Sequence, residues 1–172
     1  MYRYRLSDAA EIDSADRSLC ELAVELASII LGIGKPIVRF IAACDDGFIK
    51  MKLPINAYSP SNGKEFFVRS GLTPGELVTA AIHETRHVWQ WRNRAWASRP
   101  MAVVERDAEL FSHEVWGNHA RNGDHAALTR TLGLIHIEWV KAAVSARRVD
   151  LSSAWTKPGR NNFGPRRIEF TS

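Results

Sequence analysis

The sequence predicts an α+β fold in which an N-terminal helix and a small, mainly antiparallel sheet precede a group of helices. Three observations lead to this expectation. An apolar repeat at helical spacing opens the chain, short runs of β-forming residues follow it, and the second half returns to helical periodicity after a strong helix-start signal. The 172 residues are enough for one domain with a substantial core.

The first element expected is a helix over residues 14–31. Asp13 or Ser14 can cap its first turn, and Gly32 and Gly34 end it. Its apolar side chains recur every three or four residues, at Leu19, Leu22, Ala23, Leu26, Ile29 and Ile30. That spacing places them on one face of a helix, which is therefore expected to pack against the core.

Three runs rich in β-branched and aromatic residues predict strands over residues 36–42, 47–53 and 64–69. The middle run alternates apolar residues with lysines, so one face of that strand is expected to meet solvent. Cys44-Asp45-Asp46-Gly47 has the composition of a hairpin turn and would join the first two strands. Residues 54–63 are expected to form a loop because they end in Pro-Ser-Asn-Gly.

Helices are expected in the remainder of the domain. Thr73-Pro74-Gly75-Glu76 combines a capping residue, a proline at the first helical position and a capping-box glutamate, and predicts a helix to about Arg94. A second helix should begin near Pro100 and end near His119, and a third should span residues 125–147.

Residues 1–150 are thus predicted to form a single domain, and residues 151–172 an irregular basic C-terminal tail. The net charge of +4 comes largely from this tail, for which the simplest interpretation is a solvated segment. A basic tail can also contact nucleic acid, but no recognition helix or stacking motif accompanies it, so a nucleic-acid partner is not expected.

Composition places the chain among ordinary globular proteins, since 45% of the residues are hydrophobic and 24% are charged. Cys20 and Cys44 are too few for a disulfide framework and are expected to be inert thiols. The longest apolar stretch, residues 22–33, contains Glu25 and is too short to cross a membrane. With no targeting segment evident, a cytoplasmic location is expected, although unconventional secretion would leave no mark in the sequence.

The segment His83-Glu84-Thr85-Arg86-His87 contains candidate metal ligands and a candidate general base. Two histidines four residues apart on a helix lie about 40° apart around the axis and about 6 Å along it, so both imidazoles can bind one metal ion. Zinc with an open position binds a water and lowers its pKa, and the Glu84 carboxylate can take the proton as general base. The alternative is a pair of solvent-facing histidines, but the capping box and the apolar neighbours favour a packed helix.

A third protein ligand is expected from the following helix. Glu105 and Glu109 are again four residues apart, and 17 residues separate Glu105 from His87. That length allows two more helical turns, a link and the start of an antiparallel helix. One carboxylate can bind the metal while the other orients a ligand histidine. An exposed carboxylate pair is the alternative, and the histidine motif favours Glu105 as the ligand.

Together these residues resemble the gluzincin metallopeptidases, the thermolysin-like clan, in which a ligand glutamate follows the His-Glu-x-x-His helix on a later helix. Residues 104–111 are similar to the Glu-x-x-Ala-x-x-Phe signature of the small single-domain gluzincins. The resemblance covers roughly residues 73–116 and implies a minimal gluzincin-like fold. In those proteins the alanine of the signature lets the two helices approach. A third histidine at the metzincin spacing is absent.

The resemblance also implies a role for each site residue. His83, His87 and Glu105 would hold Zn²⁺, and Glu84 would act as general base. Glu109 stands where thermolysin-like enzymes carry an aspartate that supports a ligand histidine. In the family, an edge strand near the active-site helix binds the substrate peptide as an added strand.

A peptidase needs a donor for the oxyanion of its tetrahedral intermediate. Tyr58 and His113 are the main candidates for this donor, and His119 and a C-terminal arginine are further candidates. His113 continues the face of Glu105 and Glu109, and it can equally be a histidine of the outer shell or of the surface. Tyr58 lies in the expected loop.

The function expected is therefore that of a zinc-dependent metallopeptidase acting on protein or peptide substrates through a Glu84-activated, zinc-bound water. The alternative is a catalytically inactive or latent zinc-binding module of a phage or secretion system, whose tail could block the cleft. The oligomeric state stays open.

Overall fold

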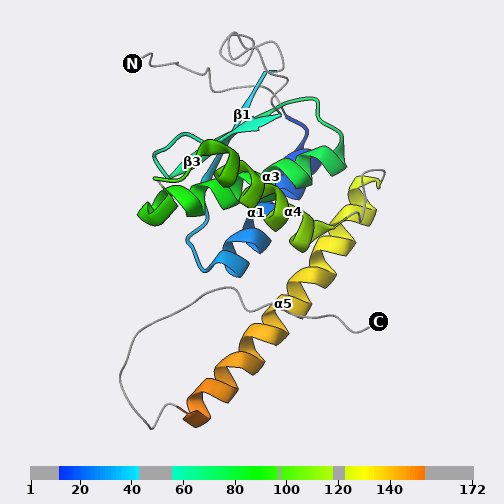
Figure 1. Ribbon diagram of the computed structural model, residues 1–172. Coiled ribbons are helices and arrows are strands. Elements are labelled where there is room, and N and C mark those ends of the chain that lie inside the picture. Colours follow the sequence, from blue (N-terminus) through cyan, green and yellow to red (C-terminus); the bar gives the residue numbers. More distant parts are fainter. Residues whose placement is uncertain (1–11, 43–55, 97, 118–122, 154–172) are drawn as a thin grey trace. The chain divides into compact units, whose positions relative to one another are not determined.

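The structure, a computed structural model, describes four stretches of the chain: residues 12–42, 56–96, 98–117 and 123–153 (Figure 1). The strand expected over 47–53, the turn before it, and His119 lie outside these residues, as does the tail from residue 154. The chain divides into two units, residues 1–137 and 138–172, and the boundary falls inside the last helix.

Helix α1 spans Ser14–Leu31, as predicted. The Asp13 carboxylate accepts a hydrogen bond from the Ala15 backbone N–H at 3.0 Å, which satisfies one of the free donors of the first turn. At the other end Gly32 has φ 64°, a left-handed conformation that glycine adopts without steric cost and that ends the helix. The apolar face is buried, with Leu19 and Leu26 almost inaccessible to solvent.

The sheet has three strands in the order β1-β3-β2: β1 (Ile37–Ile41), β2 (Ala57–Tyr58) and β3 (Glu65–Arg69). β1 pairs with β3 in parallel over five residues, and the short β2 pairs with β3 in antiparallel. The expectation of a mainly antiparallel sheet is therefore wrong for the described strands. Parallel pairing requires a crossover connection, and the chain between Ile41 and Glu65 is long enough to supply one.

Strand β2 lies in the segment that was expected to be a loop. The sequence does not predict this strand because two residues are too short a run to produce a periodic signal. Along β3 the side chains alternate as predicted for a strand with one covered face. Phe66 and Val68 are fully buried, whereas Phe67 between them is half-buried.

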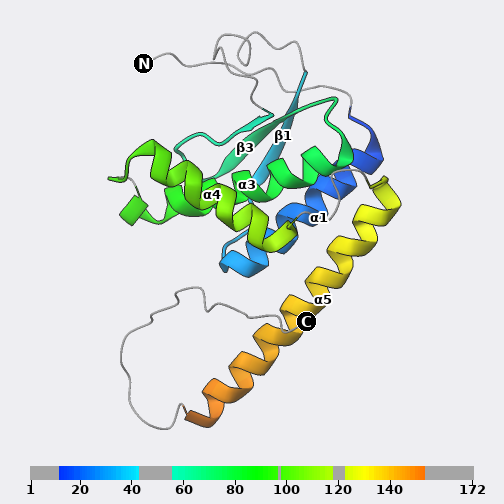
Figure 2. The same cartoon turned by 45° about the vertical axis from the view of Figure 1, so that its right-hand side comes forward.

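Helix α3 spans Pro74–Arg92 and begins with the predicted capping box. The Thr73 backbone N–H donates to Glu76 Oε2 at 2.8 Å, and the Glu76 backbone N–H donates to Thr73 Oγ1 at 3.4 Å. The helix contacts α1, the sheet and α4, so most of its circumference is covered (Figures 1 and 2). This central position explains why polar residues such as Thr85 and Gln90 are completely buried on it.

The 3₁₀ turn η1 (Arg94–Trp96) leads to α4, which spans Met101–Trp116 and packs against α3. Ala108 is fully buried on α4, one turn after Glu105. Helix α4 ends three residues earlier than expected, because Gly117 adopts φ 61° and donates its N–H to the His113 carbonyl at 2.7 Å.

Helix α5 spans His125–Ser153. It continues past the expected end at Arg147, and residues 151–153, expected to be irregular, are helical because neither glycine nor proline occurs between Arg147 and Pro158. In the first unit, His125 Nε2 lies 2.6 Å from Asp16 Oδ1 of α1, and Leu128 and Leu132 are fully buried. Among the helices described, none is both long and apolar enough to cross a bilayer.

Candidate metal centre

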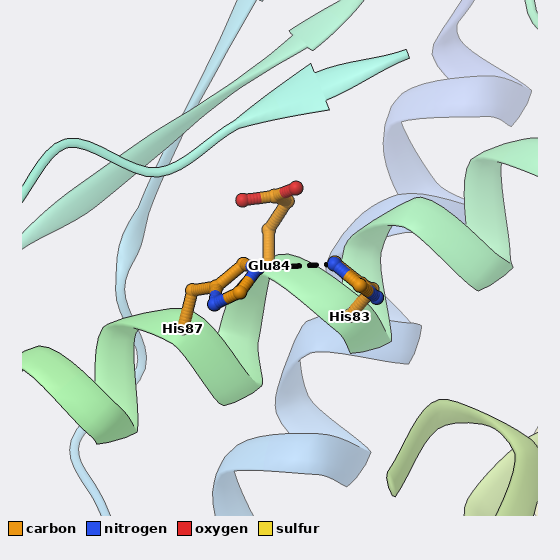
Figure 3. Close-up of side chains that lie close together, drawn as sticks. All are labelled: His83, Glu84 and His87. Carbon is orange, nitrogen blue, oxygen red and sulfur yellow. Dashed lines mark hydrogen bonds between the residues drawn. The ribbon is translucent and has the colours of Figure 1, made fainter. Parts of the chain in front are cut away.

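Three side chains of α3 form the first part of the candidate metal centre. The helical repeat brings His83 and His87 to the same side of the helix, with their ring centroids 4.7 Å apart and their planes nearly perpendicular. The side chain of Glu84 rises between them and points toward the sheet (Figure 3). Candidate ligand atoms of the three residues all lie within 4.8 Å of one another. The sequence motif thus forms a compact group of nitrogen and oxygen donors.

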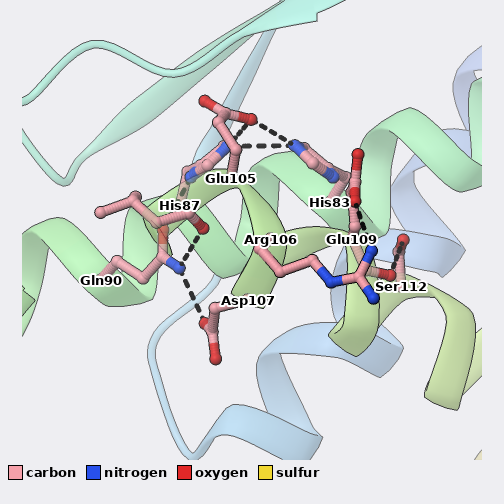
Figure 4. Close-up of polar contacts among 9 residues, drawn as sticks. His83, His87, Gln90, Glu105, Arg106, Asp107, Glu109 and Ser112 are labelled. Carbon is pink, nitrogen blue, oxygen red and sulfur yellow. Dashed lines mark hydrogen bonds and ion pairs between the residues drawn. The ribbon is translucent and has the colours of Figure 1, made fainter. Parts of the chain in front are cut away.

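Glu105 of the neighbouring helix α4 brings a further carboxylate to the two imidazoles (Figure 4). Its Oε2 lies 3.3 Å from His87 Nε2 and 3.4 Å from His83 Nε2, and the two Nε2 atoms are 3.0 Å apart. Ligands placed 2.0–2.1 Å from a tetrahedral zinc ion are about 3.3 Å from one another. The three atoms therefore have the mutual spacing of three protein ligands of one zinc ion.

Two carboxylates adjoin the imidazoles, and their geometry separates their roles. Glu105 closes the tighter triangle with both Nε2 atoms, and half of its side chain remains exposed. Glu84 is only 6% exposed, and among the described residues its Oε2 has no hydrogen-bond partner. A buried, unpartnered carboxylate oxygen beside the triangle has the position of a proton acceptor, so Glu105 fits the third ligand and Glu84 the base.

The environment of Glu84 alters its acidity. Burial, and then the negative charge of Glu105, raise the pKa of Glu84 from 4.5 to about 8. A carboxylate whose ionisation is disfavoured in this way holds a proton more strongly than a solvent-exposed one. At neutral pH most Glu84 side chains of the metal-free protein are therefore protonated, and a cation bound nearby would lower this pKa toward the carboxylate form that a general base requires.

The acidity of His83 changes in the opposite direction. Burial, and then the charge of His87, lower its pKa below 6.5, although Glu105 and Glu109 act against this change. A lowered pKa keeps the imidazole neutral, and neutral imidazole is the form that binds a metal ion.

A network of buried polar groups lies behind His87. Its Nδ1 lies 2.7 Å from Gln90 Oε1, and Gln90 Nε2 donates to the Val104 carbonyl at 2.9 Å and to Asp107 Oδ2 at 2.7 Å. Arg86 donates to both oxygens of Asp107, at 2.6 and 3.0 Å. The Arg86 guanidinium also lies 4.0 Å from the centroid of the Trp89 ring.

This network holds Asp107 in its ionised form. Burial alone would raise the pKa of Asp107, but hydrogen bonds from Arg86 and Gln90 outweigh it, and the pKa is lowered. Gln90, Asp107 and Arg86 were not predicted as site residues from the sequence. The available signal was the three-residue interval between His87 and Gln90, which puts both on one helical face.

Glu109 is close enough to His83 for its charge to act on that imidazole. Its carboxylate is largely exposed and lies 3.6 Å from Arg106 Nη1. No hydrogen bond to a ligand histidine is present among its described contacts. Its predicted supporting role stays a prediction, while the corresponding position behind His87 is taken by Gln90.

The two predicted oxyanion donors are not brought into the triangle of ligand atoms. His113 is exposed on α4, two turns after Glu105. Tyr58 is 37% exposed on β2, the short strand that contacts α3. The catalytic roles expected for both residues stay predictions.

Comparisons with models of protein families, with curated proteins and with solved structures find no match to this chain. The resemblance to the gluzincins therefore stays a prediction from the sequence motifs.

Proposed function

We propose that this protein is a zinc-dependent metallopeptidase of gluzincin type that cleaves protein or peptide substrates. The supporting observation is the triangle formed by His83 Nε2, His87 Nε2 and Glu105 Oε2, with sides of 3.0, 3.3 and 3.4 Å. Two imidazoles and one carboxylate are a common donor set of catalytic zinc sites, which leave a fourth position open.

His83 and His87 would hold the metal from α3, and Glu105 would hold it from α4. Zinc at this site supplies a Lewis acid, which polarises a carbonyl and lowers the pKa of a water molecule. Glu84 takes the proton of the attacking water and passes it to the leaving amine. Its Oε2 is suited to this role because it is buried and has no described partner to compete for the proton.

The site on two packed helices supports a gluzincin-like rather than a metzincin-like centre. The proposed third ligand, Glu105, belongs to a separate helix, α4, whose buried Ala108 lies one turn after it. A small side chain there leaves room for α3 and α4 to approach, so that Glu105 reaches the histidines.

The decisive experiment combines zinc content with cleavage of a fluorescence-quenched peptide library. We expect about one zinc ion per chain in the wild type and in Glu84→Gln. Cleavage by Glu84→Gln should fall by about 10²- to 10⁴-fold, the usual contribution of a general base. Glu105→Gln should lose zinc, whereas Glu114→Gln, at an exposed position of the same helix, should retain both zinc and cleavage.

Each alternative outcome has a defined meaning. A wild-type protein that binds no zinc contradicts the metal site. A wild-type protein that holds zinc and cleaves no peptide in the library contradicts the peptidase and supports the inactive zinc-binding module. Retention of zinc by Glu105→Gln together with its loss from Glu84→Gln would exchange the roles of the two carboxylates.

A further inference from the structure

The amide of Gln90 has only one orientation that satisfies its surroundings. The side chain is completely buried, so water cannot replace a missing partner. Its Nε2 faces the Val104 carbonyl and Asp107 Oδ2, both of which only accept hydrogen bonds. A flipped amide would place Oε1 against two acceptors and leave both N–H groups without partners.

The orientation of this amide determines the proton position on His87. With Nε2 of Gln90 committed to two acceptors, its Oε1 must face His87 Nδ1 at 2.7 Å. The Oε1 atom can only accept, so His87 Nδ1 must carry the hydrogen. In a neutral imidazole the other nitrogen, Nε2, then has a free lone pair, and this atom lies in the triangle with His83 and Glu105 (Figure 4).

The same network is anchored on both helices. Asp107 belongs to α4, and both of its carboxylate oxygens accept hydrogen bonds from Arg86 of α3, so Oδ2 faces Gln90 as an acceptor. Gln90 also binds the backbone of α4 at Val104. The contacts that join α3 to α4 are therefore the contacts that orient the Gln90 amide.

We propose that Gln90 is a positioning residue that fixes the Nδ1–H tautomer of His87 and so presents the Nε2 lone pair to the metal. The inference deepens the proposed function and rests on it for the identity of the ligand. Without Gln90 the Nε2–H tautomer becomes accessible, and that hydrogen must be displaced before a metal ion binds.

The test compares Gln90→Met with Thr85→Val. Methionine keeps the length of the side chain and removes its hydrogen bonds. Thr85 is a matched control because it is also fully buried on α3, and its hydroxyl donates to the Ala81 carbonyl at 2.7 Å, outside the network. Zinc dissociation constants should rise by roughly 10- to 100-fold in Gln90→Met and stay at the wild-type value in Thr85→Val.

A second measurement depends on neither zinc nor the variants. Two-dimensional ¹H–¹⁵N correlation of the histidine rings in the metal-free wild type at pH 8 should show a protonated Nδ1 and an unprotonated Nε2 on His87. A protonated Nε2 would overturn the inference, and so would equal zinc affinities of Gln90→Met and Thr85→Val. A wild type that binds no zinc would instead contradict the proposed function, while the tautomer measurement would still decide the role of Gln90.

Discussion

At the scale of single residues, the site places an acidic side chain where its charge is poorly stabilised. Glu84 is buried, its Oε2 has no described partner, and Glu105 adds a second negative charge nearby. Such an arrangement costs stability in the metal-free protein, because a buried charge needs a partner. A cation at the triangle would supply that partner, so metal binding and folding should be coupled.

The raised pKa of Glu84 predicts how the stability of the metal-free Glu84→Gln variant differs from that of the wild type as the pH changes. Below pH 4.5 Glu84 is protonated in both states, so the variant and the wild type should differ little. Between pH 4.5 and about 8 the unfolded wild type releases a proton that the folded state retains, so wild-type stability falls as the pH rises. The variant lacks this loss and should be more stable by roughly 3 to 5 kcal/mol above pH 8.

Urea denaturation at pH 4, 6 and 9 in a metal chelator measures the difference. Glu114→Gln is the control, because that carboxylate is exposed and should show no such trend. Parallel pH profiles of the wild type and Glu84→Gln would show that Glu84 ionises normally in the folded protein.

At the scale of elements, the position of Glu105 depends on how closely α4 approaches α3. Ala108 is fully buried one turn after Glu105, and the Arg86–Asp107 pair and the Gln90–Val104 hydrogen bond join the same two helices. Glu105, the proposed third ligand, is thus held by packing and by polar contacts between helices that are separate in sequence.

Enlarging Ala108 should therefore disturb folding and metal binding together. We expect Ala108→Leu to destabilise the protein by about 1–3 kcal/mol, because the interface has no room for the added methyl groups. Zinc affinity should fall as well, since Glu105 is moved away from the histidines. Ala102→Leu is the matched control, at an exposed position of the same helix. Equal stability and zinc affinity of the two variants would contradict this account of the helix interface.

At the scale of the whole molecule, the first turns of α5 belong to the unit that contains the candidate metal centre. The boundary between the two units follows Ile137, and Leu128 and Leu132 before it are fully buried. The contact between His125 and Asp16 joins the start of α5 to α1. Stability of the site-bearing unit should therefore depend on residues far along the chain from the metal motif.

Truncation of Leu132 to alanine should lower the free energy of unfolding by about 2–5 kcal/mol, through lost burial and the cavity left behind. Leu134→Ala provides the control on the same helix, since Leu134 is 66% exposed. Its effect should stay within about 0.5 kcal/mol. Thermal or urea unfolding measures both, and similar losses in the two variants would contradict the burial of Leu132 in this unit.

Features that depend on neighbouring residues could be predicted from the amino-acid sequence. Asp13 and Gly32 set the ends of α1, and Thr73 and Glu76 set the start of α3, because caps are made by side chains and backbone within one turn. The placement of His83 and His87 on one side of α3 likewise follows from the helical repeat. The order of helical and strand periodicities along the chain was enough to predict the α+β class.

Features that depend on contacts between distant segments could be established only from the folded chain. The parallel pairing of β1 with β3, the approach of Glu105 to both histidines, and the contact of Gln90 with Asp107 each join residues that local periodicity does not relate. Glu105 and Glu109 share a helical face, and the histidine motif and the resemblance to the gluzincins both favoured Glu105 as the ligand. The distance of each carboxylate from the histidines is set by how α3 and α4 pack, and that packing is a property of the folded chain.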